Sequence, residues 1–358
     1  MGREATSAGA AGRPTLAAVA ARAGVSPSTA SLAFSGSGPV SKATRERVLA
    51  AASELNYGGP DPRAKSLRTG RSGIIGVVVE DRLRDAFRDP MSLAMLDGIA
   101  EEAGAAGAGL LLLSDTGGER IDVSSAPMDA VILVGCSQSL DAAVAPLRRR
   151  GLPIIAIEAD EMDGVLAIGL DNRPASKRAA QYLADLGHVH VAVVTLELDD
   201  THDARPIPDD WQRIATGHTS RERLLGVRDV YRSVGGWVAS GSSIDAGREA
   251  GLALLGDRAS ARRPTAVIAQ SDLLAVGVLR AAAELGLRVP EDVSVVGFDG
   301  IRVDEAGGVE LTTVVQPGVD KGRAAGRAAI GLIEGADVQR VDFTSELRVG
   351  TTTGPPPP

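Results

Sequence analysis

Residues 15–55 read TLAAVAARAGVSPSTASLAFSGSGPVSKATRERVLAAASEL and carry three helical patterns separated by glycine breaks. In the first pattern, small apolar residues recur at helical spacing behind Thr15, whose hydroxyl can cap the free N–H groups of a helix start. Gly24 ends this helix. Ser26 and Pro27 then start a second helix, because serine is a good cap and proline is tolerated at the first helical position.

The short glycine-containing connection between these two helices is typical of a helix-turn-helix, whose second helix enters the major groove of DNA. We predict this second helix from Pro27 to about Phe34, with Ser28, Thr29, Ser31 and Leu32 on its outward face. In the third helix, which follows Ser41, the predicted buried stripe is Val48, Ala52 and Leu55, and the predicted outward residues are Arg45 and Arg47. The helix pattern alone also fits a small helical bundle without a DNA-binding role.

Length and charge constrain the organisation of the rest of the chain. The 358 residues suit two or three domains, and an apolar content of 44% is enough for large cores. Residues 1–71 contain ten Lys/Arg and four Asp/Glu and so carry a net charge of +6. Because the whole chain carries −8, the remaining residues carry −14. The positive end is where contacts with DNA phosphates would be needed, and an acidic body would discourage non-specific binding.

Other features favour a cytoplasmic protein. The single Cys136 excludes an internal disulfide framework and fits a reducing compartment. No apolar run approaches the length of a membrane span, and the first residues, MGREATSAGAAGRP, lack the hydrophobic core of a signal peptide. Residues 1–14 are small and polar and are expected to be disordered, as is the proline-rich tail at 351–358.

From Ser72 onward, short apolar runs alternate with helical stretches, which predicts α/β structure with parallel sheets covered by helices on both faces. The predicted strands are 74–79, 110–114, 130–134, 154–157, 191–196, 236–239, 266–269 and 293–298. The predicted helices are 92–106, 140–150, 174–186, 221–234, 244–255, 273–285 and 321–334. This number of elements fits two doubly wound lobes better than one large sheet. The segment 198–219 matches no element and is interpreted as an insertion or a divergent loop.

Several segments resemble the lac repressor (LacI/GalR) family of bacterial transcription regulators. They are TLAAVAARAGVSPSTAS, SGPVSKATRERVLAAASELNY, SRERLLG (220–226), SD followed by LLAVG (271–277) and VSVVGFD (293–299), in the family's order. The resemblance implies a helix-turn-helix headpiece over 15–58, a hinge over 59–71 and a two-lobed periplasmic-binding-protein-like domain over 72–350. It places the first lobe at about 72–170 and 305–336 and the second at about 171–304 and 337–350, with crossings near 170, 299–311 and 334–341.

The resemblance also implies a DNA-binding surface made of the headpiece and the hinge. The hinge would form a helix only on operator DNA, with Leu67 wedged into the minor groove; a flexible basic linker is the alternative. The family usually has arginine where this chain has Leu32. The predicted DNA-contacting residues are Thr15, Ser26, Pro27, Ser28, Thr29, Ser31, Leu32, Ala64, Leu67 and Arg68.

Ligands of doubly wound folds bind outside the carboxyl ends of the strands, here in the cleft between the lobes. Carried over from the family's motifs, Arg223, Ser271 and Asp299 are predicted to contact a small-molecule effector, and Glu80 and Glu158 are first-lobe candidates at strand ends. Arginine and carboxylate side chains suit a polyhydroxylated ligand such as a sugar, because one donates and the other accepts hydrogen bonds. Phe87, Asp89 and Pro90 are expected to border the cleft.

Each effector candidate also has a structural interpretation. Arg223 could pair with a nearby carboxylate such as Glu222, and Asp299 could hold the crossover together. Asp272 fits a helix cap as well as a ligand contact and is set aside.

Other chemistry is not supported by the residue patterns. The glycines of 104–109 precede a strand instead of following one, so they predict a helix-ending turn and not a phosphate loop. His188, His190, His202 and His218 lack carboxylate or cysteine partners at metal-ligand spacing. We therefore expect no metal, no cofactor and no enzymatic activity.

Two functional classes remain. The first is a sequence-specific transcriptional regulator, a repressor in this interpretation, that binds a palindromic operator as a homodimer and responds to an effector. The second is a solute-binding protein without a regulatory role. A solute-binding protein would need a secretion signal and would have no use for residues 15–71. The sequence therefore favours the regulator.

Overall fold

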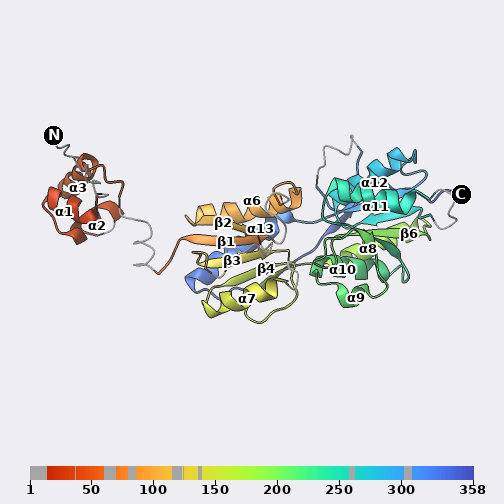
Figure 1. Cartoon of the computed structure of the whole chain (residues 1–358), viewed down its shortest axis with the longest axis horizontal. Helices are drawn as coiled ribbons and strands as arrows, with labels where there is room; N and C mark the ends of the chain where they lie inside the picture. The colour runs from red at the N-terminus through yellow and green to blue at the C-terminus, as the bar shows by residue number, and fades with distance from the viewer. Residues whose placement is uncertain are drawn as a thin grey trace, which may run out of the picture. The chain divides into compact units, whose positions relative to one another are not determined.

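The computed structural model describes residues 14–36, 38–59, 70–79, 86–114, 123, 125–135, 139–257, 263–301 and 309–358. The chain divides into two compact units, 1–72 and 73–358 (Figure 1). The first unit is the headpiece, and the second contains both lobes.

The headpiece consists of α1 (Leu16–Ala23), α2 (Pro27–Ser35) and α3 (Lys42–Glu54). Each helix follows its predicted cap residue, Thr15, Ser26 or Ser41. The hydroxyl of each cap accepts a hydrogen bond from a backbone N–H of the first turn that has no partner within the helix. The three helices pack around a core of small side chains. The core residues are Val19, Ala20, Ala30, Ala33, Val48, Ala51 and Ala52. The predicted three-helix arrangement is confirmed.

The first lobe has a sheet in the order β12-β5-β4-β3-β1-β2, in which every neighbouring pair is parallel. Its strands are β1 (Ile74–Val79), β2 (Gly109–Ser114), β3 (Ala130–Val134), β4 (Ile154–Ile157), β5 (Leu166–Leu170) and β12 (Val341–Phe343). Helices α6 (Pro90–Ala105) and α13 (Gly318–Glu334) cover one face, and α7 (Ser139–Arg149) covers the other (Figure 1). A Cβ at Gly322 would collide with the carbonyl of Met95, so glycine lets α13 pack closely on α6.

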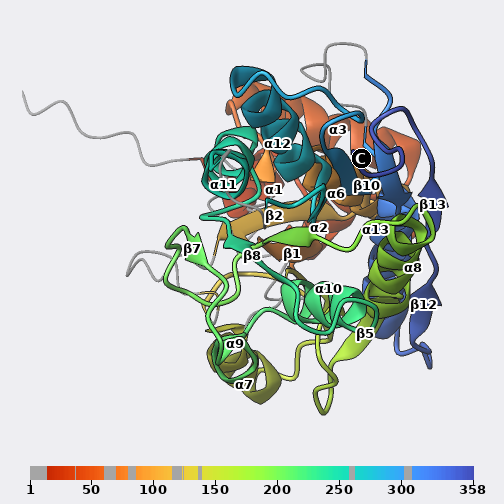
Figure 2. The same cartoon turned by 90° about the vertical axis from the view of Figure 1, so that its right-hand side faces the viewer.

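The second lobe has a sheet in the order β13-β11-β10-β9-β6-β8-β7. Its strands are β6 (Val191–Thr195), β7 (Arg205–Pro206), β8 (Gly235–Val238), β9 (Ala266–Ala269), β10 (Ser294–Asp299), β11 (Thr312–Val315) and β13 (Glu346–Arg348). Helices α8 (Asn172–Asp185) and α10 (His218–Arg228) cover one face, and α11 (Ile244–Leu255) and α12 (Asp272–Glu284) cover the other (Figure 2). The predicted pair of doubly wound lobes is therefore present.

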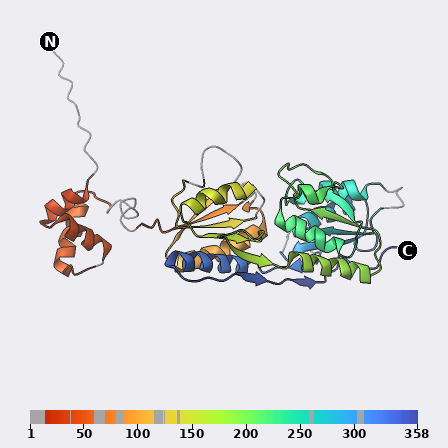
Figure 3. The same ribbon diagram turned by 90° about the horizontal axis from the view of Figure 1, so that it is seen from below.

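Two of the three predicted crossings between the lobes are displaced. The first lies between β5 and α8, as expected near 170. The second was expected at 299–311, but β11 still pairs with β10 in the second lobe, so the chain crosses after Val315. The third was expected at 334–341, but β12 pairs with β5 in the first lobe, so the chain crosses between Phe343 and Glu346 (Figure 3). Both displaced crossings follow strands that were not predicted from the sequence, β11 and β12.

The segment 198–219 is an ordered part of the second lobe. It contains β7 and the short helix α9 (Trp211–Ile214), and Trp211 is buried in the core beside α10. The indole ring lies under the guanidinium of Arg228, 5.0 Å from its centre. Trp211 thus anchors the segment 198–219 in the core of the second lobe.

The tail at 351–358 was predicted to be disordered, and this is wrong for its first half. Thr352 is fully buried, and its hydroxyl donates to the carbonyl of Val295. The carbonyl of Gly354 lies 2.9 Å from the Nε2 atom of His188. These hydrogen bonds hold the start of the tail against the second lobe, and the composition of the tail alone does not reveal them.

Candidate functional site

The predicted DNA-contacting residues of the headpiece lie on and just before α2. The Ser26 hydroxyl accepts from the backbone N–H of Thr29 at 3.1 Å and lies 2.8 Å from the Ser28 hydroxyl, so its first role is to cap the helix. Ser28 is exposed, and Thr29 and Ser31 are half-buried. These short polar side chains present hydroxyls along the helix. The arrangement leaves α2 available as a recognition helix.

Leu32 is 36% exposed and lies against Gly38, in the turn that follows α2. Arg45 was predicted to point outward, which is only partly correct. Its Nε–H donates to the carbonyl of Ala33 at 3.0 Å and so ties α3 to the end of α2.

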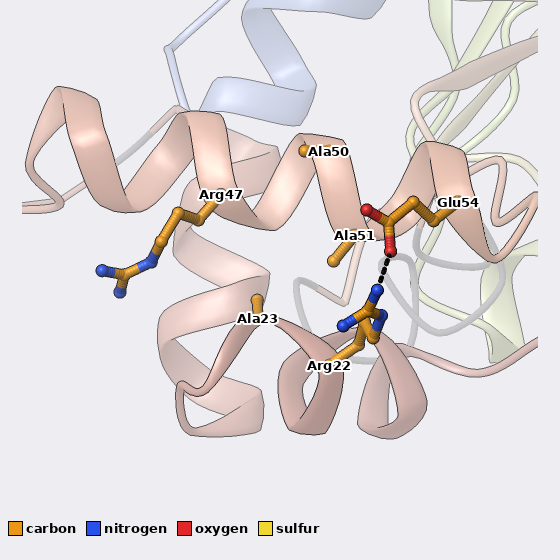
Figure 4. Close-up of a pocket in the computed structure, with 6 residues that line it drawn as sticks. All are labelled: Arg22, Ala23, Arg47, Ala50, Ala51 and Glu54. Atoms are coloured by element: carbon orange, nitrogen blue, oxygen red, sulfur yellow. Dashed lines mark ion pairs between the residues drawn. The ribbon is translucent and has the colours of Figure 1, made fainter.

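A shallow hollow of about 210 Å³ lies between α1 and α3 (Figure 4). It is lined by Arg22, Ala23, Arg47, Ala50, Ala51 and Glu54. Arg22 and Glu54 form an ion pair of 2.6 Å across it. Both side chains are more than half exposed, so the pair contributes little stability.

Four predicted site residues lie outside the described residues. They are Ala64, Leu67 and Arg68 in the hinge and Glu80 after β1. Cys136 also lies outside them.

The effector candidates Arg223 and Asp299 meet Glu158 where the two lobes face each other. Arg223 projects from α10 and is only 3% exposed. Its Nε–H donates to the Asn172 side chain at 2.8 Å, and an Nη1–H donates to the carbonyl of Gln270 at 2.5 Å. The guanidinium also stacks on the Phe298 ring, 3.6 Å from its centre. Strand ends and a helix start of the second lobe thus hold this cation in place.

Two carboxylates flank this guanidinium at equal distances. Glu158, after β4 in the first lobe, and Asp299, at the end of β10 in the second, each have an oxygen 3.7 Å from an Arg223 nitrogen. These distances exceed those of hydrogen bonds. Arginine has five N–H donors, and in the described part of the chain only two of those of Arg223 make hydrogen bonds.

A second cation joins the two carboxylates on their other side. Lys321, in the first turn of α13, is fully buried, and its ammonium donates to both Glu158 and Gln316. The amide nitrogen of Gln316 donates to Asp299 at 2.6 Å. Five side chains therefore form a closed polar ring. They are Arg223, Glu158, Lys321, Gln316 and Asp299.

The pKa values of the two ring carboxylates are shifted in opposite directions. Burial opposes ionisation of Glu158, but the charges of Lys321 and Arg223 outweigh it and hold the pKa of Glu158 at about 2. Burial raises the pKa of Asp299 well above its usual value, against the opposing charge of Arg223, and the neighbouring Asp272 raises it further. Glu158 is thus firmly ionised, whereas Asp299 is easily protonated.

Both ring carboxylates belong to residues with unusual backbone angles. Glu158 has φ +56° and Asp299 has φ +124°, in the region that favours glycine. Such strain persists only where surrounding contacts enforce it, and it is common at binding sites.

Ser271 lies beside the ring, but its hydroxyl is engaged in structural contacts. It accepts from the backbone N–H of Leu274 at 3.2 Å and from the Ser242 hydroxyl at 3.0 Å, so Ser271 is the cap of α12.

Asp272 had been considered as that cap, which is wrong. Its carboxylate accepts from the Thr313 hydroxyl at 2.6 Å and from the backbone N–H of Ile301 at 2.9 Å. Burial raises the pKa of Asp272 to about 7. Asp272 therefore ties the start of α12 to β11 and to the segment that follows β10.

A second contact between the lobes lies nearer the surface. Asp160, in the first lobe, accepts from Arg221 at 2.6 Å and from the Nδ1 atom of His218 at 2.8 Å, both in α10. Asp160 is half exposed, and its partners lower its pKa even though burial opposes them. The carboxylates at 158 and 160 thus face the arginines at 223 and 221 across the lobes.

Comparisons with known proteins match both parts of this architecture. A model described as "Bacterial regulatory proteins, lacI family" matches residues 15–59, and one for a periplasmic binding protein-like domain matches 180–353. An HTH-type transcriptional regulator of Mycolicibacterium smegmatis is 34% identical, over 96% of this chain and 97% of its own length. The chain belongs to the lacI family of bacterial regulatory proteins.

Solved structures of lacI-family regulators have the same fold. The chain matches a CelR–cellobiose complex at 26% identity with a TM-score of 0.65, covering 95% of this chain and 100% of that one. It matches the lac repressor dimer bound to operator and the anti-inducer ONPF at 24% identity with a TM-score of 0.73, covering 95% and 99%. As a lacI-family member, the protein is a DNA-binding transcriptional regulator and not an enzyme. Among the helices described, none has the length and apolar character needed to cross a membrane.

The sequence interpretation missed three members of this site. Lys321 and Gln316 complete the ring, and Asn172 donates to Glu158 at 2.7 Å. Gln316 directly follows β11, so the rule that polar groups at strand ends face the cleft would have identified it had β11 been recognised. The sequence carries no comparable signal for Lys321, because a lysine in a long helix is usually exposed.

Proposed function

We propose that this regulator binds a neutral, polyhydroxylated metabolite, a sugar or a close relative, between its lobes, and that binding changes its affinity for operator DNA. The observation that carries the proposal is the Arg223 guanidinium, which is buried between carboxylates from both lobes at distances too long for hydrogen bonds. Hydroxyl groups can both donate and accept, so a polyol can bridge Arg223 to Glu158 on one side and to Asp299 on the other.

The charges around Arg223 favour a neutral ligand over an anionic one. Two cations, Arg223 and Lys321, act on Glu158, and the charges of three further acids, Asp299, Asp272 and Asp89, act on Arg223. A phosphorylated ligand would add negative charge near Asp299 and Asp89, two acids whose pKa values burial already raises. The sugar named in the CelR–cellobiose complex is itself uncharged, which supports this choice.

A thermal-shift screen of the full-length protein tests the ligand class, because a ligand of the native state raises the unfolding temperature. The panel contains matched pairs of neutral and phosphorylated sugars, together with nucleosides. We expect neutral compounds to stabilise the wild type and their phosphorylated partners not to. Stabilisation by the phosphorylated members alone would contradict the proposal.

On the DNA side, we propose a homodimer that represses transcription from a palindromic or near-palindromic operator, acting in the cytoplasm where chromosomal DNA lies. One short recognition helix reads few base pairs, so a two-fold dimer doubles the site. The proposed contacts are Thr15, Ser26, Pro27, Ser28, Thr29, Ser31 and Leu32 in the headpiece, with Ala64, Leu67 and Arg68 carried over from the family's hinge. Selection from random DNA tests this proposal, and recovery of only asymmetric sites would contradict it.

The alternative of a solute-binding protein without a regulatory role is not favoured. It leaves residues 15–59, which match the lacI-family model, without a purpose.

A further inference from the structure

The polar ring between the lobes has a tight half and a loose half. On the Arg223 side, both carboxylates lie 3.7 Å from the guanidinium. On the Lys321 side, hydrogen bonds connect Glu158 to Lys321, Lys321 to Gln316, and Gln316 to Asp299. The loose half is where a ligand hydroxyl can hydrogen-bond to the guanidinium and to a carboxylate at the same time. The tight half lies behind the carboxylates and is closed to a ligand, because Lys321 has no exposed surface.

We infer that Lys321 is the positioning residue of the ligand site: through Glu158 and Gln316, it aims one carboxylate from each lobe at the ligand beside Arg223. This inference rests on the proposed function of the cleft. Lys321 does not touch the ligand itself. It acts on Glu158 directly and on Asp299 through the Gln316 side chain.

The orientation of the Gln316 amide is the central step of the argument. Its oxygen accepts from the Lys321 ammonium, so its nitrogen is left to face Asp299, to which it donates at 2.6 Å. An ammonium has only donors, and it therefore admits just one of the two amide orientations. Without Lys321, the Gln316 amide loses one of the two contacts that fix its orientation, and its hold on Asp299 loosens.

Backbone geometry supports the same role. Glu158 and Asp299 both have φ in the region that favours glycine, so their side-chain directions depend on outside contacts. Lys321 supplies such a contact for each of them, directly or through one intermediate. A lysine that only filled space in α13 would not need to reach both.

If Lys321 has this role, removing its charge should make ligand binding depend on pH through Glu158. The groups that face Glu158 are Lys321 from α13, Arg223 from α10 and the uncharged Asn172 from α8. The charges of Asp299, Asp272 and Asp89 act on Arg223 as well. Burial alone would raise the pKa of Glu158, and Lys321 is the larger of the two charges that lower it. Removing the ammonium should therefore let Glu158 take up a proton as the pH falls.

The test compares the full-length wild type, Lys321→Met and the double variant Lys321→Met/Glu158→Gln. Methionine keeps the volume of lysine, and the glutamine removes the buried carboxylate that would otherwise lack its partner. Binding of D-glucose, D-ribose and cellobiose is measured by calorimetry between pH 5.5 and 8. For any probe that binds the wild type, we expect Lys321→Met to bind roughly ten- to a hundredfold more weakly at pH 8, and more weakly still at pH 5.5.

The double variant separates positioning from stability. It should fold even if Lys321→Met does not, and its weak binding should lack the additional loss at low pH that Lys321→Met shows relative to the wild type. Wild-type affinity in either variant, or a flat pH profile in Lys321→Met, would overturn the inference.

If none of the three sugars binds the wild type, the carbohydrate assignment fails. The role of Lys321 is then tested by thermal stability in the absence of ligand. Lys321→Met should then lose thermal stability relative to the double variant as the pH rises from 5.5 to 8. A constant difference between them would overturn the role of Lys321.

Discussion

The Arg223 guanidinium in the second lobe and the Glu158 carboxylate in the first lie 3.7 Å apart in the protein interior. Neither group can hydrogen-bond the other at this distance, yet each is fixed by other residues, Arg223 by Asn172 and Gln270 and Glu158 by Asn172 and Lys321. These contacts hold the guanidinium and the carboxylate at a spacing that one hydroxyl group can bridge by hydrogen-bonding to both. Ligand binding can therefore be tested separately from folding and from DNA binding.

Asp299→Asn should give a protein that still binds its operator but responds to the effector only at higher concentration. Asparagine lacks the second carboxyl oxygen that Asp299 can offer to a ligand hydroxyl, so effector binding should weaken by roughly ten- to a hundredfold. Operator affinity without effector should not change, because the headpiece is a separate unit. One operator-binding assay with an effector titration measures both quantities. Identical response curves would show that Asp299 is structural.

Asp160→Asn should shift the effector response by a smaller factor. Asp160 joins the lobes through Arg221 and His218 but is half exposed, so its loss should raise the half-maximal effector concentration by about twofold to fivefold. Asp163→Asn removes the same charge from an exposed site in the same segment and is the matched control. Equal responses of the two variants would exclude a role for the Asp160 contact.

Leu32→Arg should change the base preference of operator binding. Leucine offers only apolar contact, for instance with a thymine methyl group, whereas arginine can bond to guanine in the major groove. The matched control is Leu49→Arg, which adds the same charge at an exposed position on α3. We expect the control to strengthen binding to all sequences alike. Unchanged preference in Leu32→Arg would remove Leu32 from the reading surface.

Leu67→Ala addresses the hinge, which lies outside the described residues. If Leu67 wedges between base steps, the substitution should weaken operator binding while hardly changing binding to random DNA, which depends on phosphate contacts. Salt titrations on both DNAs measure the difference. Equal losses would favour the flexible linker.

Asp272 should make the stability of the effector-binding unit depend on pH. Burial raises its pKa to about 7, so the folded state binds a proton more readily than the unfolded state, where the pKa is near 3.8. Its contribution to stability is therefore fully present below about 3.8 and is lost as the pH rises through 7.

Unfolding temperatures of the wild type and Asp272→Asn at pH 5 and pH 8 measure this effect. The advantage of the wild type should be smaller at pH 8, by at least a few degrees. A difference that does not depend on pH would show that Asp272 has the same protonation state in the folded and unfolded protein.

The sequence predicted those elements whose signals are local. The headpiece helices begin at Thr15, Ser26 and Ser41, because a cap is readable from a few neighbouring residues. Most buried strands of the two sheets were found for a similar reason, since runs of Val, Ile and Leu with both faces covered are distinctive.

Elements that depend on distant partners were missed. β12 has three residues, VDF, and is a strand only because it pairs with β5. Because β11 and β12 were not recognised, two crossings were misplaced and Gln316 was overlooked. The same limit applies to the residues of the site. Arg223, Glu158 and Asp299 were identified from motifs and strand ends. Lys321 was missed, because its burial depends on Glu158, which lies 163 residues away in the chain.

The three passages of the chain between the lobes have a consequence for how such proteins diversify. The headpiece is joined to the rest at a single junction near residue 72, so one recombination event can give the same sensor a new DNA-reading unit. Neither lobe is a continuous piece of chain, because each combines segments from before and after a crossing. Exchanging the second lobe would require three simultaneous junctions, and the residues that recognise the ligand are therefore inherited together.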